Sequence, residues 1–313
     1  PVGFQSRRHL VAKTGTLSVL VLRISTNDST PSLSADEFHK LIFEDEVSLH
    51  MQYAACSFGK LNLVPSEYGI LDLYLNTSAE GATPISLVSM ANEALRERLG
   101  IAKTSDASDL LLMIMPPGTG DWAAFSGVGH PRSVYNDLWG GYTSSLLHEV
   151  GHGLGLAHAN ENGSDYSDYT SYMSAGHKKT NWPAKSFNAK NHWDFSWYKD
   201  RSVSVDPIEA PQILKIAAFV DYDKTQQGEY VIAEVGIGTH GYHYGEFQLD
   251  SLGFVINFAS GWMGNSPRRV WRFFWATQAF VRRHRIHSNE IQIWLGNACS
   301  LASLNSELLS VLD

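Results

Sequence analysis

The sequence predicts an α+β fold followed by a smaller β-rich C-terminal region. Two apolar runs, residues 17–22 and 110–115, have the length of buried strands. Apolar side chains at helical spacing over residues 85–99 predict an amphipathic helix, which Gly100 ends. From Ile213 onward the apolar pattern changes to that of strands. The first two patterns predict a mixed sheet-and-helix domain, and the third predicts the β-rich region after it.

Near the N-terminus, local signals predict one strand and one helix. The Val- and Leu-rich run 16–24 is expected to be a strand that ends in a cluster of Ser, Thr, Asn, Asp and Pro. Ser34 has the character of an N-cap, and Glu37 stands at the capping-box position. These two residues predict a helix over 35–42.

The middle of the chain is expected to contain more turns and loops. Residues 60–64 and 70–75 are predicted to be two short strands around a turn at Pro65. The segment 118–141, rich in Gly, Ser and aromatic residues, is interpreted as a loop. Residues 180–200 show no clear period and are interpreted as packed loops with room for a short helix.

Three regions are predicted along the chain, with a boundary near Pro207 and Pro211. They are a catalytic domain, a β-rich region and a tail, at residues 1–205, 206–264 and 265–313. The strands expected in the second region are 213–222, 229–235, 242–247 and 253–258. The tail interleaves arginines with aromatic residues, which suits either a surface for an acidic polymer or membrane face, or an amphipathic helix packed on the body.

Composition excludes some classes of function. The formal net charge of −8 argues against nucleic acid as a partner, because phosphate binders usually present a basic surface. No apolar run reaches the eighteen residues of a membrane span. Cys56 and Cys299 are too few for a disulfide framework, and either one bridge or two buried thiols fits them.

One motif carries the chemistry, His148-Glu149-Val150-Gly151-His152-Gly153-Leu154-Gly155-Leu156-Ala157-His158. Residues four apart on a helix share a face, so His148 and His152 can bind one metal ion. Gly155 allows the chain to turn back and bring His158 to the same ion. Three histidines with a fourth position left for water are typical of a catalytic zinc site.

Glu149 is the candidate catalytic residue. It follows His148 directly and points about 100° around the helix, which places it beside the metal. There its carboxylate can take a proton from a zinc-bound water and later deliver it to the leaving amine. Thr143 or Ser144 is expected to cap the start of this helix.

The motif HExxHxxGxxH resembles the signature of the metzincin zinc metallopeptidases. These enzymes also have a methionine beneath the metal site, the Met-turn, and Met173 lies fifteen residues after His158. The segment 169–176 around Met173 is similar to the Met-turn of the gametolysin family, secreted peptidases known from algal cell-wall lysis. Residues 52–61, 187–198 and 242–258 are also similar to segments of that family. The resemblance implies a zincin fold, a twisted mixed β-sheet with a long zinc-motif helix below it.

The chain departs from the family at two places and in its tail. The family often has a cysteine shortly before the zinc helix, but residues 139–142 contain none, so Cys56 lacks the partner that the family pattern implies. Several metzincins place an oxyanion-supporting tyrosine where Ala175 stands, which leaves Tyr172 and Tyr169 as candidates for that role. The tail after Gly264 matches no known segment.

The resemblance implies a secreted, monomeric, zinc-dependent endopeptidase acting on extracellular or cell-wall proteins and glycoproteins. Residues 110–115 are expected to form the edge strand with which an extended substrate pairs. Two alternatives use the same ligands: a catalytically silent binding or adhesion module that contains zinc, and a zinc hydrolase of a non-peptide amide. Intact Glu149 argues against the silent module, because a structural site has no use for that carboxylate.

Overall fold

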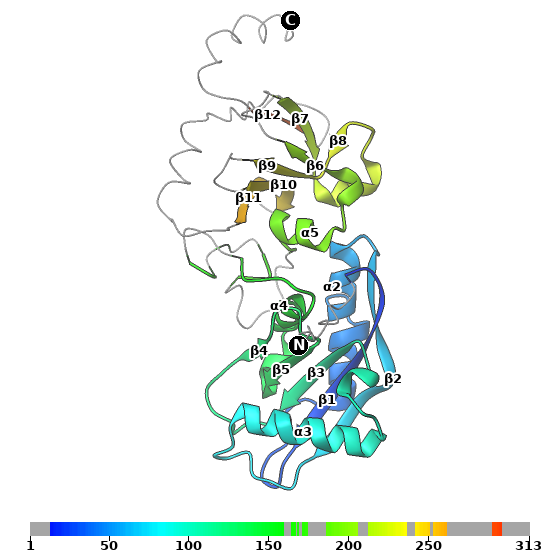
Figure 1. Cartoon of the computed structure of the whole chain (residues 1–313), viewed down its shortest axis with the longest axis vertical. Coiled ribbons are helices and arrows are strands. Elements are labelled where there is room, and N and C mark those ends of the chain that lie inside the picture. The colour runs from blue at the N-terminus through cyan, green and yellow to red at the C-terminus, as the bar shows by residue number, and fades with distance from the viewer. Residues whose placement is uncertain are drawn as a thin grey trace, which may run out of the picture. The chain divides into compact units, whose positions relative to one another are not determined.

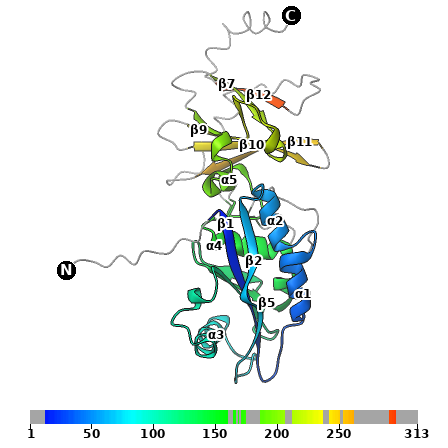
Figure 2. The ribbon, with the colours of Figure 1, turned by 90° about the vertical axis from the view of Figure 1, so that its right-hand side faces the viewer.

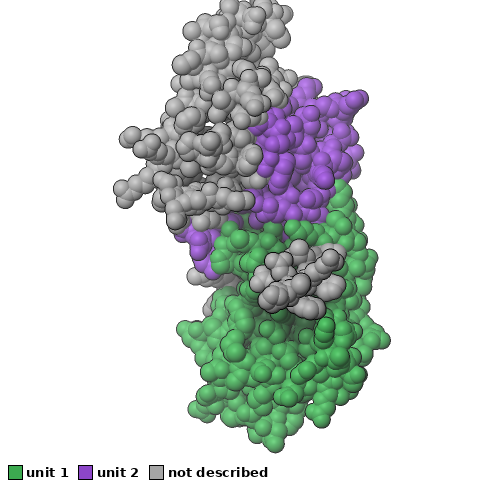
Figure 3. All heavy atoms as spheres, viewed as in Figure 1, with its two compact units in different colours: residues 1–158, 169–186 green, residues 159–168, 187–313 purple. Residues whose placement is uncertain are grey.

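The computed structural model describes residues 13–159, 164–166, 168, 171–174, 186–205, 212–236, 242–250, 253–261 and 290–295. The chain divides into two compact units, coloured separately in Figure 3. Unit 1 comprises Pro1–His158 and Tyr169–Ser186, and unit 2 comprises Ala159–Asp168 and Phe187–Asp313. All three histidines of the motif belong to unit 1.

Unit 1 is built on a five-stranded mixed sheet in the order β2-β1-β3-β5-β4. Four strands run parallel, and β4 is antiparallel to β5. Figure 1 shows these strands in blue to green. The strands are β1 (Gly15–Ser25), β2 (Leu61–Tyr74), β3 (Leu110–Met115), β4 (Ala124–Ser126) and β5 (Arg132–Asn136).

Helices cover both faces of this sheet, with α3 on one side and α1 and α2 on the other (Figure 2). The helices of unit 1 are α1 (Ala35–His39), α2 (Leu49–Cys56), α3 (Pro84–Leu99) and α4 (Thr143–Gly153). The expected capping box is present, since Ser34 accepts from the Glu37 N–H and the Glu37 carboxylate accepts from the Ser34 N–H. After α1 the chain continues as a π-helical turn, Lys40–Glu44. Gly100 ends α3 with φ +66°, as predicted.

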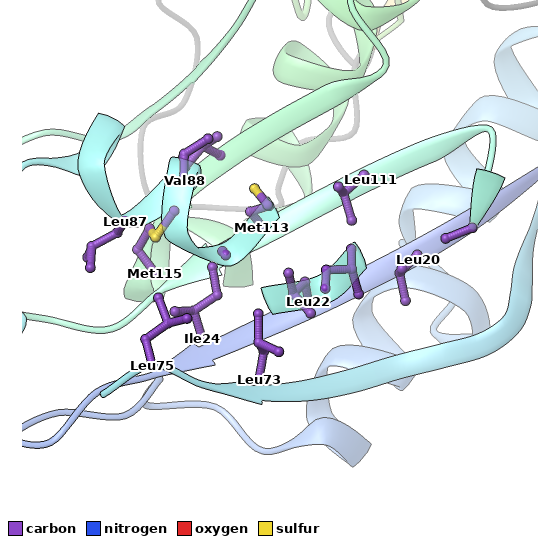
Figure 4. Close-up of a cluster of buried hydrophobic side chains, with 14 residues drawn as sticks. Leu20, Leu22, Ile24, Leu73, Leu75, Leu87, Val88, Leu111, Met113 and Met115 are labelled. Carbon is purple, nitrogen blue, oxygen red and sulfur yellow. The ribbon is translucent and has the colours of Figure 1, made fainter. Parts of the chain in front are cut away.

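The core between α3 and the sheet is made of alternate residues along the strands (Figure 4). Because side chains alternate across a strand, β1 and β3 each bury one set under α3 and the other set on the opposite face. All six residues of β3 are buried, as expected of a central parallel strand. The α3 face contains Leu20, Leu22, Ile24, Leu73, Leu75, Leu87, Val88, Ala91, Leu95, Leu111, Met113 and Met115.

The two predicted strands both pair with β1, as residues 61–65 and 70–74. The predicted turn between them is wrong, because residues 66–69 lie within one strand, β2. Proline lacks an N–H and breaks an internal ladder, but β2 is an edge strand where that donor is not needed. The irregularity is absorbed in the pairing with β1: Val19 lies opposite Pro65, but Val21 lies opposite Ile70. Residues 66–69, directly after Pro65, therefore form an irregular insertion within the strand.

The interpretation of 118–141 as a loop is also wrong, since this segment contains β4 and β5. Both strands are short, and the glycines around them hide the alternation that would reveal them. The expected substrate edge changes as a result. Residues 110–115 form β3, which lies between β1 and β5, so β4 is the edge of the sheet on this side.

Unit 2 contains one helix, α5 (Ala189–Phe195), and two small sheets among its described residues. The short helix expected within 180–200 is therefore confirmed. A four-stranded sheet has the order β11-β10-β9-β6, and a three-stranded sheet has the order β12-β7-β8. Their strands are β6 (Ser202–Val205), β7 (Gln212–Ala217), β8 (Glu229–Tyr230), β9 (Ile232–Gly236), β10 (Tyr242–Asp250), β11 (Gly253–Gly261) and β12 (Glu290–Leu295).

The strands expected after Ile213 are present with shifted ends. Residues 218–222, predicted to continue the first strand, instead enter a 3₁₀ turn, Phe219–Lys224. The expected strand 229–235 is divided into β8 and β9, which belong to different sheets. Apart from β12, the basic-aromatic tail lies outside the described residues. Within the described part of the chain, no helix has the length and apolar character needed to cross a membrane.

Candidate active site

The motif helix α4 is held in unit 1 by its apolar face. Leu146, Leu147 and Val150 are buried, and α4 packs against α2, β4 and β5. The expected side-chain cap is absent: the helix begins after Tyr142 with no capping side chain, and the Thr143 hydroxyl donates to the Val47 carbonyl at 2.9 Å. The start of α4 is therefore fixed by a contact with the segment before α2.

Three histidine rings meet at the end of α4. His148 and His152 lie one turn apart on the helix, and their ring centroids are 4.8 Å apart. The ring of His158 lies 5.3 Å from that of His148 and 4.7 Å from that of His152. One ligand nitrogen from each ring lies within 4.8 Å of the other two. Gly155 makes the return of the chain possible, with φ +101° in the region that side chains rarely adopt.

Backbone carbonyls orient two of these rings. The Nδ1 of His148 lies 2.8 Å from the carbonyl of Tyr172, and the Nδ1 of His152 lies 2.8 Å from that of Leu156. A carbonyl only accepts, so each Nδ1 carries the proton and donates it. The lone pair of each ring is then on Nε2, which is the arrangement of a metal-ligating histidine with an outer partner.

Burial keeps the two helical histidines neutral. Desolvation, with a further contribution from His152, lowers the pKa of His148 to about 4. Desolvation also lowers the pKa of His152, because only 6% of this residue is exposed. Neutral imidazoles at neutral pH are the form that binds a metal.

Glu149 is buried beside the histidines with little compensation. Only 7% of the residue is exposed, and among the described residues its Oε2 atom has no hydrogen-bond partner. Burial raises the pKa of the carboxyl group to about 8. A buried carboxyl with an unsatisfied oxygen is costly to the fold, so its retention points to a role in chemistry.

The residues present fit a divalent metal ion that prefers nitrogen ligands. Three imidazoles converge, and two are oriented by backbone carbonyls through their other nitrogen. A neighbouring cation would also favour the charged form of the Glu149 carboxyl group, which burial otherwise disfavours. Both features make this site suitable for a metal.

The segment around Met173 lies against the metal-site histidines through its backbone. Tyr172 supplies the carbonyl that accepts from His148, and its N–H donates to the Ser186 carbonyl at 3.2 Å. Met173 is fully buried, and its N–H donates to the Ser171 hydroxyl at 3.1 Å. The described part of this segment is therefore a tight turn tied to the site, while the role of the Met173 side chain stays a prediction.

Of the two tyrosines proposed for oxyanion support, Tyr172 belongs to the described residues. The Tyr172 hydroxyl lies 3.3 Å from the Gln52 side-chain oxygen, and the residue is buried. Tyr169 lies outside the described residues. Cys56 is buried with the Ser186 hydroxyl 3.3 Å from its sulfur, and Cys299 lies outside the described residues.

Several contacts that support the site were not foreseen from the sequence. The hydroxyl of Tyr53, on α2, donates to the Leu147 carbonyl of α4 at 3.0 Å, and Tyr53 is fully buried. The carbonyls of Leu156 and Tyr172 act through the backbone, so their side chains gave no signal. The sequence of residues 49–56 has no amphipathic pattern, so it gave no signal for Tyr53 either.

Two histidines on a helix, a third returned by a glycine bend and a buried carboxyl group beside them are the arrangement of a metallopeptidase site. Comparison with known families agrees. Residues 16–206 match the family described as gametolysin peptidase M11, which is more than half of the chain, so the protein belongs to this family. No curated protein matched the sequence.

Proposed function

We propose that this member of the gametolysin family is a zinc-dependent endopeptidase in which Glu149 is the catalytic base and acid. The observation that carries the proposal is the convergence of His148, His152 and His158, with ligand nitrogens within 4.8 Å of one another. Three nitrogen ligands with a fourth position open to solvent or substrate are typical of catalytic zinc.

The three imidazoles would hold zinc through nitrogen, two of them through Nε2. When bound, zinc supplies Lewis-acid polarisation and lowers the pKa of water. Glu149 removes a proton from the attacking water as the water oxygen bonds to the carbonyl carbon of the substrate. Glu149 then delivers this proton to the amide nitrogen as the C–N bond breaks. Burial of its carboxyl group keeps bulk water from competing for the proton.

The edge strand β4 is the proposed binding strand for the substrate. It pairs with β5 on one side only and packs against α4, which carries the catalytic residues. An extended peptide can add to such an edge through main-chain hydrogen bonds. Pairing of this kind requires a polypeptide substrate, which favours an endopeptidase over a hydrolase of small amides.

The test compares Glu149→Gln and Glu149→Ala with the parent protein. Both variants should keep one zinc per chain, measured by elemental analysis, and lose about 10²-fold or more in turnover of gelatin or casein. The matched control is His158→Ala, which should lose zinc and activity together. Parent-like cleavage by Glu149→Gln would contradict the role of this carboxylate.

The natural substrates are proposed to be extracellular or cell-wall proteins and glycoproteins, with the enzyme secreted as a monomer. Gelatin and a purified cell-wall glycoprotein, run as zymograms with and without a chelator, test the substrate class. Cleavage should disappear with the chelator and return when zinc is added. Bands that form equally in chelator would mean that another activity degrades these proteins.

A further inference from the structure

A tight turn joins the proposed binding strand to the next strand. The turn consists of residues 127–130, and the His130 N–H donates to the Gly127 carbonyl at 2.9 Å. Gly129 stands at its third position with φ +71°, as a type II turn requires. We call residues 127–130 the docked turn, because its backbone lies directly on the end of α4.

One hydrogen bond and one close approach of the backbone hold this turn against the end of α4. The Gly129 N–H donates to the carbonyl of His152 at 2.7 Å. His152 lies in the last turn of α4, where carbonyls lack partners within the helix. Its carbonyl also accepts from the Gly155 N–H at 2.9 Å, so the docked turn supplies a second donor to the same oxygen. In addition, a Cβ on Gly153 would lie 3.1 Å from the carbonyl oxygen of His130. The absence of a side chain at Gly153 therefore lets the two backbones approach closely.

Glycine at this position needs an explanation, because it disfavours a helix relative to alanine. Gly153 is buried in the last turn of α4, and its φ is not in the region reserved for glycine. The close approach of the His130 carbonyl is the property that a larger residue would remove.

We infer that Gly153 is a positioning residue, which through the docked turn sets the register of β4 relative to the metal-binding histidines. This inference rests on the proposed function, in which β4 binds the substrate. The pairing with β4 would fix where the scissile bond of a bound peptide lies, and His152 would fix where the metal ion lies. The docked turn connects β4 to His152, because the Gly129 N–H donates to the His152 carbonyl.

A displacement of β4 should slow the cleavage of long substrates more than the cleavage of short ones. A Cβ on Gly153, 3.1 Å from the His130 carbonyl oxygen, would require this oxygen to move by a few tenths of an ångström. Since a displacement of about 1 Å between substrate and catalytic groups can cost about 10²-fold in rate, this smaller shift should cost a few-fold. Gly153→Ala should push the docked turn, and β4 with it, away from α4. A blocked dipeptide is too short to pair along β4 and should be cleaved much as before.

The experiment measures kcat/KM for a long peptide and for a blocked dipeptide, and takes their ratio. In Gly153→Ala this ratio should fall about 3–5-fold, with zinc content unchanged. The sites cut in a long peptide should also shift along its sequence. A parent-like ratio would overturn the inference, whatever the absolute rates. Glu93→Ala, on the exposed face of α3, is the control and should keep the parent ratio.

A second variant covers the possibility that Gly153→Ala does not fold. The His130 side chain is exposed, and its Nδ1 accepts from the Arg132 N–H at 3.3 Å where the turn enters β5. His130→Ala should lower the same ratio to a smaller extent, and an unchanged ratio in this variant would also overturn the inference.

Failure of the proposed function has a different signature. If the parent cleaves neither substrate, or Glu149→Gln stays active, the catalytic assignment is wrong and the inference falls with it. If the parent is active, Glu149→Gln is inactive and the ratio is unchanged in both turn variants, only the role of the docked turn is wrong.

Discussion

The low pKa of His148 predicts how the metal-stripped protein responds to acid. An unfolded chain protonates this imidazole near 6.5, whereas the folded protein resists protonation down to about 4. Between these values the unfolded state binds more protons, so the free energy of unfolding decreases as the pH falls. The contribution of His148 is fully present above about pH 6.5 and is lost as the pH approaches 4.

The size of the effect follows from the gap in pKa. The difference between 6.5 and about 4 is about 2.5 units, and each unit corresponds to about 1.4 kcal/mol, which gives roughly 3 kcal/mol. His152 acts in the same direction, since its pKa is also lowered. Glu149 acts in the opposite direction, because burial raises its pKa to about 8 and the folded state therefore binds the extra proton between this value and 4.5. The measurement is urea unfolding of the chelator-treated protein at several pH values from 7.5 to 4.

The His148→Gln variant isolates this contribution. Glutamine keeps a polar side chain but does not titrate, so the variant should lack the loss of stability that protonation of His148 causes. The difference in stability between parent and variant should therefore change by roughly 3 kcal/mol between pH 6.5 and 4, in the direction that disfavours the parent in acid. The absolute stabilities are not compared, only their slopes against pH. Equal slopes in parent and variant would refute the reasoning that burial of this imidazole makes the fold sensitive to acid.

Two further substitutions test the packing that carries the site. Tyr53→Phe removes the hydroxyl that donates to the Leu147 carbonyl, and should lower the free energy of unfolding by about 1 kcal/mol in urea titration. A variant as stable as the parent would show that this bond contributes nothing. Leu22→Ala, in the fully buried core under α3, should cost about 2–5 kcal/mol by the same measurement. A loss below about 1 kcal/mol would mean that this core is loosely packed.

The metal-binding part of the site was predictable because it is local. Helical periodicity places His148 and His152 on one face, and the freedom of Gly155 brings back His158 within six residues. None of this depends on distant segments, so an eleven-residue motif suffices. The buried central strand 110–115 was predictable for a similar reason, since an unbroken apolar run is enough to indicate it.

The errors arose where neighbours in space decide the structure. Pro65 was expected to break a strand, but it is tolerated because β2 is an edge, and edge position is not visible in a local window. β4 and β5 were missed because three to five residues between glycines show too little alternation. Because β5 and β4 were not predicted, residues 110–115 were expected to be the edge strand for the substrate. In the structure they form an interior strand, β3.

One backbone oxygen connects the histidine motif, which the sequence predicts, to the docked turn, which it does not. The carbonyl of His152 accepts the Gly155 N–H at 2.9 Å and the Gly129 N–H at 2.7 Å. The first bond belongs to the bend that returns His158, and the second belongs to the docked turn that holds β4. Because the two bonds share an acceptor, we expect a change that moves the end of α4 to disturb His158, the third proposed metal ligand, and the proposed substrate strand together. Glycine at 129 and 155 is therefore required at both ends of this link, where positive φ directs each N–H to the same oxygen.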